Sequence, residues 1–408
     1  MAVLIEPLEL ATLRRGSPIP FRKLEINVIW NAVGSFTLEM PATDRTWALI
    51  RLDGSGNLLP IGIVVDWNGI TSFSLRAEGW AYKRSLNPET GRITEALILT
   101  GSDLLSLLAN RIAFPDPTKT WAQQPTTARV YTGAAETVIK QIVAANLVTP
   151  GDPARKIPVL DVAPDQQRGQ QVSYKVVPIR PAAGPAVGDT PTIGASLMDM
   201  VRAVALQSRI GVRLALEGTR LRFDTYLPRD RSQRAVFSAA LGNLADADLA
   251  VADPTLTNAL MQTASPAYFE QAGQGSNDSW TRVEQVIDQT STDTDAAAAA
   301  REALAKGAGT VKLAVRAVDL PRLRFGADVD GVTGYQLGDI VTVDIREDVT
   351  YTDLVSRVQL VADATGAAYR ETVTPEIGAD QTADDNTITA QLAVRLRAVE
   401  QRLRATAP

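Results

Sequence analysis

The sequence predicts a multidomain protein of the α+β class that is mainly β. Its 408 residues exceed one ordinary core, because a single domain usually holds about 100 to 200 residues. Segments that alternate apolar and polar residues dominate the first hundred residues and return from residue 235, whereas helical spacing is concentrated between them. Hydrophobic residues make up 45% and charged residues 21%, which is typical of a folded globular chain.

Short strands are expected through the first hundred residues. Residues 24–30 and 35–40 alternate apolar with polar side chains, which is the pattern of half-buried strands. Residues 49–52 and 61–65 flank the Gly-rich stretch 53–57 and predict a hairpin, because these turn residues accept positive φ. No Gly-Lys-Ser/Thr follows that stretch, so we discard a phosphate-binding loop.

Residues 101–234 are predicted to form an α+β insertion. Helices are expected over residues 102–108, 131–146 and 196–209, each beginning near a residue that can cap it. A hairpin should follow over residues 212–223.

The helix expected from residue 131 carries the clearest packing signal. Thr132 can cap it, and Glu136 lies in the first turn, where the helix dipole favours a carboxylate. A buried packing face, and not a ligand groove, is the interpretation of its apolar stripe. The stripe consists of Val138, Ile139, Ile142 and Val143.

From residue 235 to residue 380 a second β domain is expected, with one helix at residues 291–306. Asp293 and Asp295 look like a calcium-loop fragment, but the EF-hand pattern is not completed, so they are interpreted as helix caps. We therefore predict no metal site. The closing strands are expected at residues 311–315, 340–343 and 354–361.

The C-terminal residues 381–408 have apolar side chains at helical spacing from Ile388 to Leu403. This pattern predicts a docking or oligomerisation helix. Packing of the helix on its own domain is the alternative.

The absence of His and Cys excludes several classes of active site. Ser-His-Asp and Cys-His nucleophiles, HExxH zinc sites and Cys/His metal clusters all require these residues. We predict no catalytic residues, no cofactor-binding residues and no cofactor. Glycoside hydrolysis by two carboxylates remains open, with acids beside aromatic rings at Asp66-Trp67 and in residues 276–280.

Sugar binding is a further alternative, since six Trp and eight Tyr could supply stacking surfaces. The Trp residues lie mostly in strand-like segments, which favours burial. The net charge of −5 argues against a protein that grips nucleic acid through phosphates. Glu6 and Glu9 interrupt the N-terminal apolar stretch, so neither a signal peptide nor a membrane anchor is expected.

Three short motifs occur in order along the chain. They are Gly34–Leu38 (Gly-Ser-Phe-Thr-Leu), Tyr131–Glu136 with Ala163–Asp165, and Tyr335–Val343 with Thr374–Gly378. Together they resemble the tail-tip hub and minor tail proteins of actinobacterial siphophages. Few Lys and many Arg, 41 residues in all, agree with a GC-rich host.

The resemblance implies two tail-tube-like β-barrel domains, at residues 1–100 and 235–380, around the insertion at 101–234 and before the docking helix at 381–408. It implies a homotrimer whose six barrels match a hexameric tail tube and leave a channel for genome ejection. The implied partners are a tail tube or distal tail protein, a downstream tip, fibre or spike protein, a tape measure protein in the lumen, and DNA that passes without specific binding.

The location that the resemblance implies is the tip of the virion tail, after synthesis in the host cytoplasm. Larger hubs often carry a peptidoglycan-cleaving domain after the barrels, whereas about thirty residues follow Gly378 here. A non-enzymatic structural protein is therefore expected. The alternative is a carbohydrate-binding or glycosidase-like tail component that acts on the host envelope.

Overall fold

The computed structural model describes residues 3–86, 93–176, 196–262, 267–270, 279–288, 300, 303–304, 307–317, 323–327, 333–346, 349–366 and 368–378. Its chain divides into unit 1, residues 1–246 and 315–375, and unit 2, residues 247–314 and 376–408. Taken together, the described residues contain more strands than helices, which confirms the expectation of a mainly β protein.

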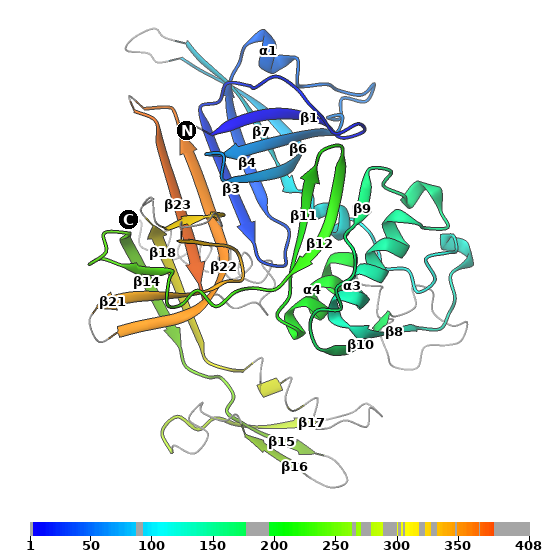
Figure 1. The fold of residues 1–408 in the computed structure, drawn as a ribbon, viewed down its shortest axis with the longest axis vertical. Helices are drawn as coiled ribbons and strands as arrows, with labels where there is room; N and C mark the ends of the chain where they lie inside the picture. Colours follow the sequence, from blue (N-terminus) through cyan, green and yellow to red (C-terminus); the bar gives the residue numbers. More distant parts are fainter. Residues whose placement is uncertain are drawn as a thin grey trace, which may run out of the picture. The chain divides into compact units, whose positions relative to one another are not determined.

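The N-terminal strands of unit 1 form an antiparallel array in the order β3-β4-β7-β6-β5-β1-β2 (Figure 1). Every second residue of β3 and β4 is buried, so the strands expected at residues 24–30 and 35–40 are confirmed. The elements are β1 (Leu4–Glu9), β2 (Arg14–Arg15), β3 (Lys23–Ile29), β4 (Ser35–Pro41), α1 (Asp44–Trp47), β5 (Ile61–Trp67), β6 (Thr71–Leu86) and β7 (Ile93–Asp103).

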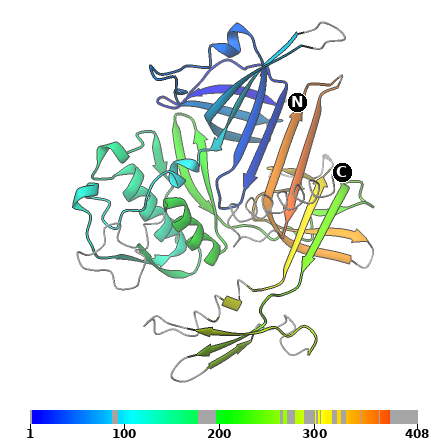
Figure 2. The same ribbon diagram turned by 180° about the vertical axis from the view of Figure 1, so that it is seen from behind.

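The second half of the chain continues the same sheet. Strand β22 pairs with β3 in antiparallel register from Arg357 opposite Ile29 to Asp363 opposite Lys23, and Figure 2 shows the orange strands beside the blue ones. The bounds are β13 (Val236–Ser238), β19 (Leu323–Phe325), β20 (Thr333–Tyr335), β21 (Ile340–Arg346), β22 (Val349–Asp363) and β23 (Arg370–Ile377).

The expectation of two tail-tube-like β-barrel domains is not confirmed by this ladder. One edge of β3 pairs with β22 and not with another N-terminal strand. The described strands of unit 1 therefore form an open sheet and not a closed barrel. The two halves are therefore joined through backbone hydrogen bonds as well as through side chains.

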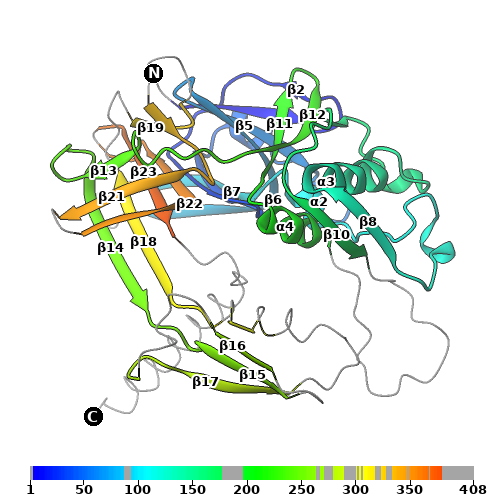
Figure 3. The same cartoon turned by 60° about the horizontal axis from the view of Figure 1, so that its bottom comes forward.

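Residues 104–176 and 196–226 of unit 1 form an α/β module around an apolar cluster that includes Val138, Ile142, Leu197 and Val201. Helices α3 and α4 lie side by side (Figure 3), and the hairpin expected at residues 212–223 is present. Its elements are α2 (Ser106–Ala109), η1 (Trp121–Gln123), β8 (Arg129–Ala134), α3 (Ala135–Val143), η2 (Ala144–Val148), η3 (Pro153–Arg155), β9 (Leu160–Val162), β10 (Gln171–Val176), α4 (Leu197–Gln207), β11 (Gly211–Glu217) and β12 (Arg220–Tyr226).

Two expected helix starts are wrong. Ser102 and Asp103 still belong to β7, because they pair with β4 and β6. Thr132 lies in β8, opposite Ser173 of β10, and does not cap α3. In both cases strand pairing overrides a local capping signal. The α4 start is confirmed, since the Ser196 hydroxyl accepts a hydrogen bond from the Asp199 backbone at 3.0 Å.

The hairpin expected across residues 53–57 is also wrong in part. Residues 49–52 form only an isolated bridge between Leu52 and Leu58, whereas β5 pairs with β1 and β6. Asp53 accepts hydrogen bonds from the backbone of Ser55 and Asn57 at 2.8 and 2.9 Å. The stretch is therefore a self-contained Asp turn.

The chain enters unit 2 along β14 (Leu244–Ala252) and leaves it along β18 (Thr310–Ala317). A small sheet in the order β16-β15-β17 packs near the apolar cluster of Leu256, Ala259, Ala300 and Leu304. Its strands are β15 (Asn258–Gln262), β16 (Ala267–Glu270) and β17 (Glu284–Asp288). Most of the helix expected at 291–306 and all of the C-terminal helix expected at 381–408 lie outside the described residues.

Candidate functional site

A polar junction in unit 1 centres on the Gly338-Asp339 turn before β21. The buried carboxylate of Asp339 accepts hydrogen bonds from the backbone N–H groups of Arg229 at 2.8 Å and Gln336 at 3.0 Å. Burial raises the pKa of Asp339, and these hydrogen bonds oppose the rise. The carboxylate thus fixes the segment that leaves β12 against the start of β21.

The same turn contacts the N-terminal strands and the α/β module. Gly338 has a φ of +82°, and a Cβ at this position would lie 2.6 Å from Nε1 of Trp30. The Tyr226 hydroxyl donates to the Leu337 carbonyl at 3.0 Å. Only a glycine fits here, so three distant parts of the sequence converge on one turn.

Asn31 provides a second connection between the sheet and the module. It is buried with a φ of 53°, a left-handed conformation that Asn tolerates better than most residues. Its side-chain amide donates to the Ile210 carbonyl at 2.8 Å and accepts from the Val212 N–H at 2.9 Å. The turn between β3 and β4 is thereby attached to β11.

The α/β module contains a buried cluster of charges. The Lys140 ammonium donates to Glu136 Oε1 at 2.6 Å, to Asp224 Oδ1 at 3.0 Å and to the Pro164 carbonyl at 2.8 Å. The Arg168 backbone N–H donates to the second Glu136 oxygen at 2.8 Å. All three lysine protons have an acceptor, as a buried ammonium requires.

Burial is the largest single influence on the pKa of Glu136 and of Asp224 and raises both. The hydrogen bonds and charge of Lys140, together with backbone hydrogen bonds, outweigh it and hold both pKa values below their usual range. The cluster is satisfied internally, and its partners come from α3, β12 and the loop after β9. These are properties of a structural network, and sequence analysis found only the Glu136 end of it.

A cavity of about 310 Å³ lies between β3, β6 and the β11 strand of the module. Asp103, Arg213, Tyr226 and Gln336 contribute its polar wall. Burial raises the pKa of Asp103 to about 7, although its carboxylate accepts N–H groups from Gly34 at 2.8 Å and Leu105 at 2.9 Å. Among the described lining residues Asp103 is the one carboxylate, so the paired acids of a glycosidase are not assembled here.

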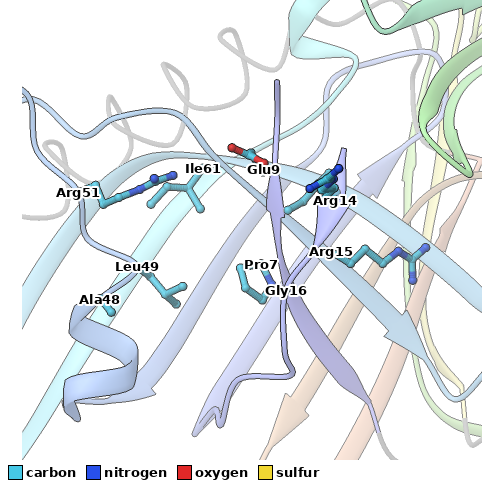
Figure 4. A pocket seen from close by; sticks show the side chains of 10 residues that line it. Pro7, Glu9, Arg14, Arg15, Gly16, Ala48, Leu49, Arg51 and Ile61 are labelled. Carbon is cyan, nitrogen blue, oxygen red and sulfur yellow. The ribbon is translucent and has the colours of Figure 1, made fainter. Parts of the chain in front are cut away.

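A second pocket, of about 380 Å³, opens between the β1–β2 pair and the connection from α1 to β5. Figure 4 shows Arg51 and Arg14 on opposite sides, with Glu9 between them. Pro7, Leu49 and other apolar side chains line its interior. Neither sequence spacing nor any motif marked these residues, because they meet only through the pairing of β1 with β2 and β5.

The acid-aromatic pairs considered as sugar sites lie in different units, Asp66-Trp67 in unit 1 and Trp280 in unit 2. Trp67 is buried in β5, whereas Trp280 of unit 2 is 94% exposed, and Asp278 lies outside the described residues. The expectation that the Trp residues are mostly buried is wrong for Trp47, Trp121 and Trp280, which are exposed.

Asp293 and Asp295 also lie outside the described residues. Within the described part of the chain no group of three or more acidic residues could hold a metal ion. None of the helices described combines the length and the apolar character needed to span a bilayer.

A model of one protein family matches most of this chain. The model for siphovirus ReqiPepy6 Gp37-like proteins matches residues 11–379, which include both halves of the shared sheet and the module. The chain belongs to this family. A search by sequence among curated proteins found no match.

Solved structures show which fold this Gp37-like protein shares. It resembles the 43 kDa tail protein of prophage MuSo2 from Shewanella oneidensis with a TM-score of 0.52, 12% identity and coverage of 92% of this chain and 97% of that one. It resembles a tail protein from Neisseria meningitidis MC58 with a TM-score of 0.52, 12% identity and coverage of 93% and 97%. The Gp37-like protein therefore has the fold of phage tail proteins, and the resemblance to siphophage tail proteins is confirmed.

Proposed function

We propose that this Gp37-like protein is a non-enzymatic structural component of the siphophage virion, located at the tail tip. The observation that carries the proposal is the match of a siphovirus family over residues 11–379, together with a tail-protein fold along 92% of the chain. Fold alone does not define function, so the siphovirus family is the decisive part.

In the proposed assembly three copies form a ring that adapts the hexameric tail tube to a threefold tip. The proposed division is 1–100 and 235–380 as tube-like parts, 101–234 as an insertion and 381–408 as a docking helix. The continuous β22–β3 ladder supports this role, because its backbone hydrogen bonds join the two tube-like parts of one subunit.

The proposed ring surrounds a channel for genome ejection. Its partners would be a tail tube or distal tail protein above, a tip, fibre or spike protein below, and a tape measure protein in the lumen. The net charge of −5 suits a channel past which DNA slides without being held.

The test is the solution mass of the full chain, measured by light scattering alone and with the candidate tail-tube protein. A trimer, or a monomer that forms a threefold ring with the tube protein, would support the proposal. A persistent monomer that ignores the tube protein would refute the ring.

A carbohydrate-binding role is the second candidate, favoured by a group of aromatic rings on α1 and β6. Trp47 contacts Trp80 and Tyr82 with ring centroids 6.0 and 5.4 Å apart, and Trp47 and Tyr82 are about 40% exposed. Exposed rings can stack on sugars. Binding to host cell walls that is lost in Trp47→Ala/Tyr82→Ala would favour this role over the ring.

A further inference from the structure

The pocket between β1–β2 and the α1–β5 connection has unmatched positive charge at its rim. Arg14 and Arg51 are exposed and form no ion pair with any described residue, whereas Arg15 pairs with Glu6 at 3.4 Å. The nearby Glu9 accepts the Thr12 hydroxyl at 2.5 Å instead of pairing with these arginines. The rim thus holds two guanidinium groups that form no ion pair with a described residue and one carboxylate, that of Glu9, which lies opposite Arg14 in the β1–β2 ladder.

Below these arginines apolar side chains contribute to the pocket wall. Pro7, Leu49 and the buried Ile61 line it. Beside it the exposed Leu59 donates its backbone N–H to the Arg51 carbonyl at 2.8 Å. Arginine next to apolar surface is the composition that distinguishes the energetically important centres of protein interfaces.

The position of the pocket also suits a protein partner. Strand β2 ends the order of strands in unit 1 and holds two residues, so the sheet is accessible beside the arginines. A short edge strand limits indiscriminate pairing with other chains. Recognition here would depend on side chains, and therefore on charge and shape.

We propose that this pocket binds a segment of a partner protein in which a carboxylate side chain neighbours an apolar one. The carboxylate pairs with the guanidinium group of Arg14 or of Arg51, on either side of Glu9, because the planar guanidinium fork suits it. The apolar side chain fills the pocket against Pro7, Leu49 and Ile61. The inference is independent of the ring proposed above.

Nucleic acid fits the pocket less well. Binding through phosphates uses many cations along a track, whereas here the arginines converge on one cavity in a chain of net charge −5. A free inorganic anion would contact the rim and leave about 380 Å³ of largely apolar space unfilled. A peptide uses both features.

The probe is a capped, fluorescein-labelled hexapeptide, Gly-Leu-Glu-Leu-Asp-Gly, measured by fluorescence anisotropy with the full chain at low salt. Its matched control is the analogue with Gln and Asn in place of Glu and Asp. The test variant is Arg14→Glu/Arg51→Glu. The control variant is Arg45→Glu, which reverses a nearby exposed charge on α1 that does not line the pocket.

We expect saturable binding of the acidic peptide, and at least about tenfold weaker binding of the amide analogue or of the double variant. The Arg45→Glu chain should keep its affinity within about twofold, and all variants should keep the wild-type circular dichroism spectrum and melting temperature.

Several outcomes would overturn the proposal. These are no saturable binding up to about 1 mM peptide, equal binding of the amide analogue, or an equal loss in Arg45→Glu. Displacement by inorganic phosphate or a DNA duplex at concentrations below that of the peptide would identify an anion or nucleic-acid site instead. A change in the self-association of the double variant alone would assign the pocket to a second copy of the chain.

Discussion

Replacing Lys140 with Met should destabilise the α/β module strongly. The change removes the three hydrogen bonds to Glu136, Asp224 and the Pro164 carbonyl. It leaves the fully buried Glu136 with Arg168 at 3.8 Å as its remaining cation, and Asp224 with the exposed Arg213 at 3.2 Å. Breaking a buried pair on one side costs about 3–5 kcal/mol, so we expect a loss of this size in the free energy of unfolding.

The assay is urea unfolding, combined with hydrogen exchange of the α3 amides followed by mass spectrometry. The control is Arg213→Ala, because Arg213 also pairs with Asp224, at 3.2 Å, but has a side chain that is 55% exposed. An exposed pair contributes less than about 1 kcal/mol. The faster exchange should be confined to the module in Lys140→Met and nearly absent in Arg213→Ala.

A triple variant, Glu136→Gln/Lys140→Met/Asp224→Asn, distinguishes the loss of the Lys140 hydrogen bonds from the cost of leaving the two carboxylates without Lys140. It removes both carboxylates, so most of the stability should return. The reasoning would be refuted if Lys140→Met lost no more stability than Arg213→Ala, or if the triple variant remained as unstable as Lys140→Met.

Three further perturbations test the junctions of unit 1. Gly338→Ala should lower the free energy of unfolding by several kcal/mol, because the added Cβ would collide with Trp30. The control, Gly218→Ala, has a φ of +60° but open space around it, so it should lower the free energy of unfolding by about 1 kcal/mol. Equal urea midpoints for the two variants would contradict this reasoning. Asn31→Ala should lower the free energy of unfolding by about 2–5 kcal/mol, because it leaves the Ile210 carbonyl and the Val212 N–H unpaired in the core. A decrease in melting temperature no larger than that of the exposed control Asn110→Ala would contradict this prediction. Burial raises the pKa of Asp103 in the folded chain from 3.8 to about 7. The folded chain therefore binds this proton more tightly than the unfolded chain does. The free energy of unfolding should fall as pH rises from about 4 to about 7, by at most about 1.4 kcal/mol per pH unit. Asp103→Asn should remove that slope, and an unchanged slope in urea titrations at pH 5 and 8 would exclude Asp103 as its source.

Local patterns predicted the individual strands well. The alternation in residues 24–30 and 35–40 survives as β3 and β4, since each strand buries one face. The capping box at Ser196 and the turn at Gly218 were equally readable, because both depend on neighbours within a few residues.

Long-range pairing could not be predicted in the same way. Ser102 and Asp103 have the residue types of a helix start, but hydrogen bonds from β4 and β6 hold them in a strand. The two tail-tube-like β-barrel domains implied by the family resemblance are not confirmed, and β3 pairs with β22, a strand from the other end of the chain. No local periodicity encodes that choice.

The candidate sites illustrate the same limit. Lys140 meets Asp224 across 84 residues, and Arg14 and Arg51 frame one pocket although neither belongs to a motif. Glu136 was noticed for its place in a helix, and its true role as the acceptor of a buried ammonium depends on β12. The absence of His and Cys excludes active sites built on these residues, but composition could not locate contact surfaces.

The β22–β3 ladder has a consequence for synthesis on the ribosome. Strand β3 is translated early, but its partner residues 357–363 lie more than 300 positions later. During elongation the outer edge of β3 has no native partner, and such an edge can pair with other nascent chains. A contact of this sequence separation forms slowly. Productive folding should therefore depend on the emergence of residues 357–363 from the ribosome, and high expression rates or low chaperone levels should lead to aggregation of shorter nascent chains.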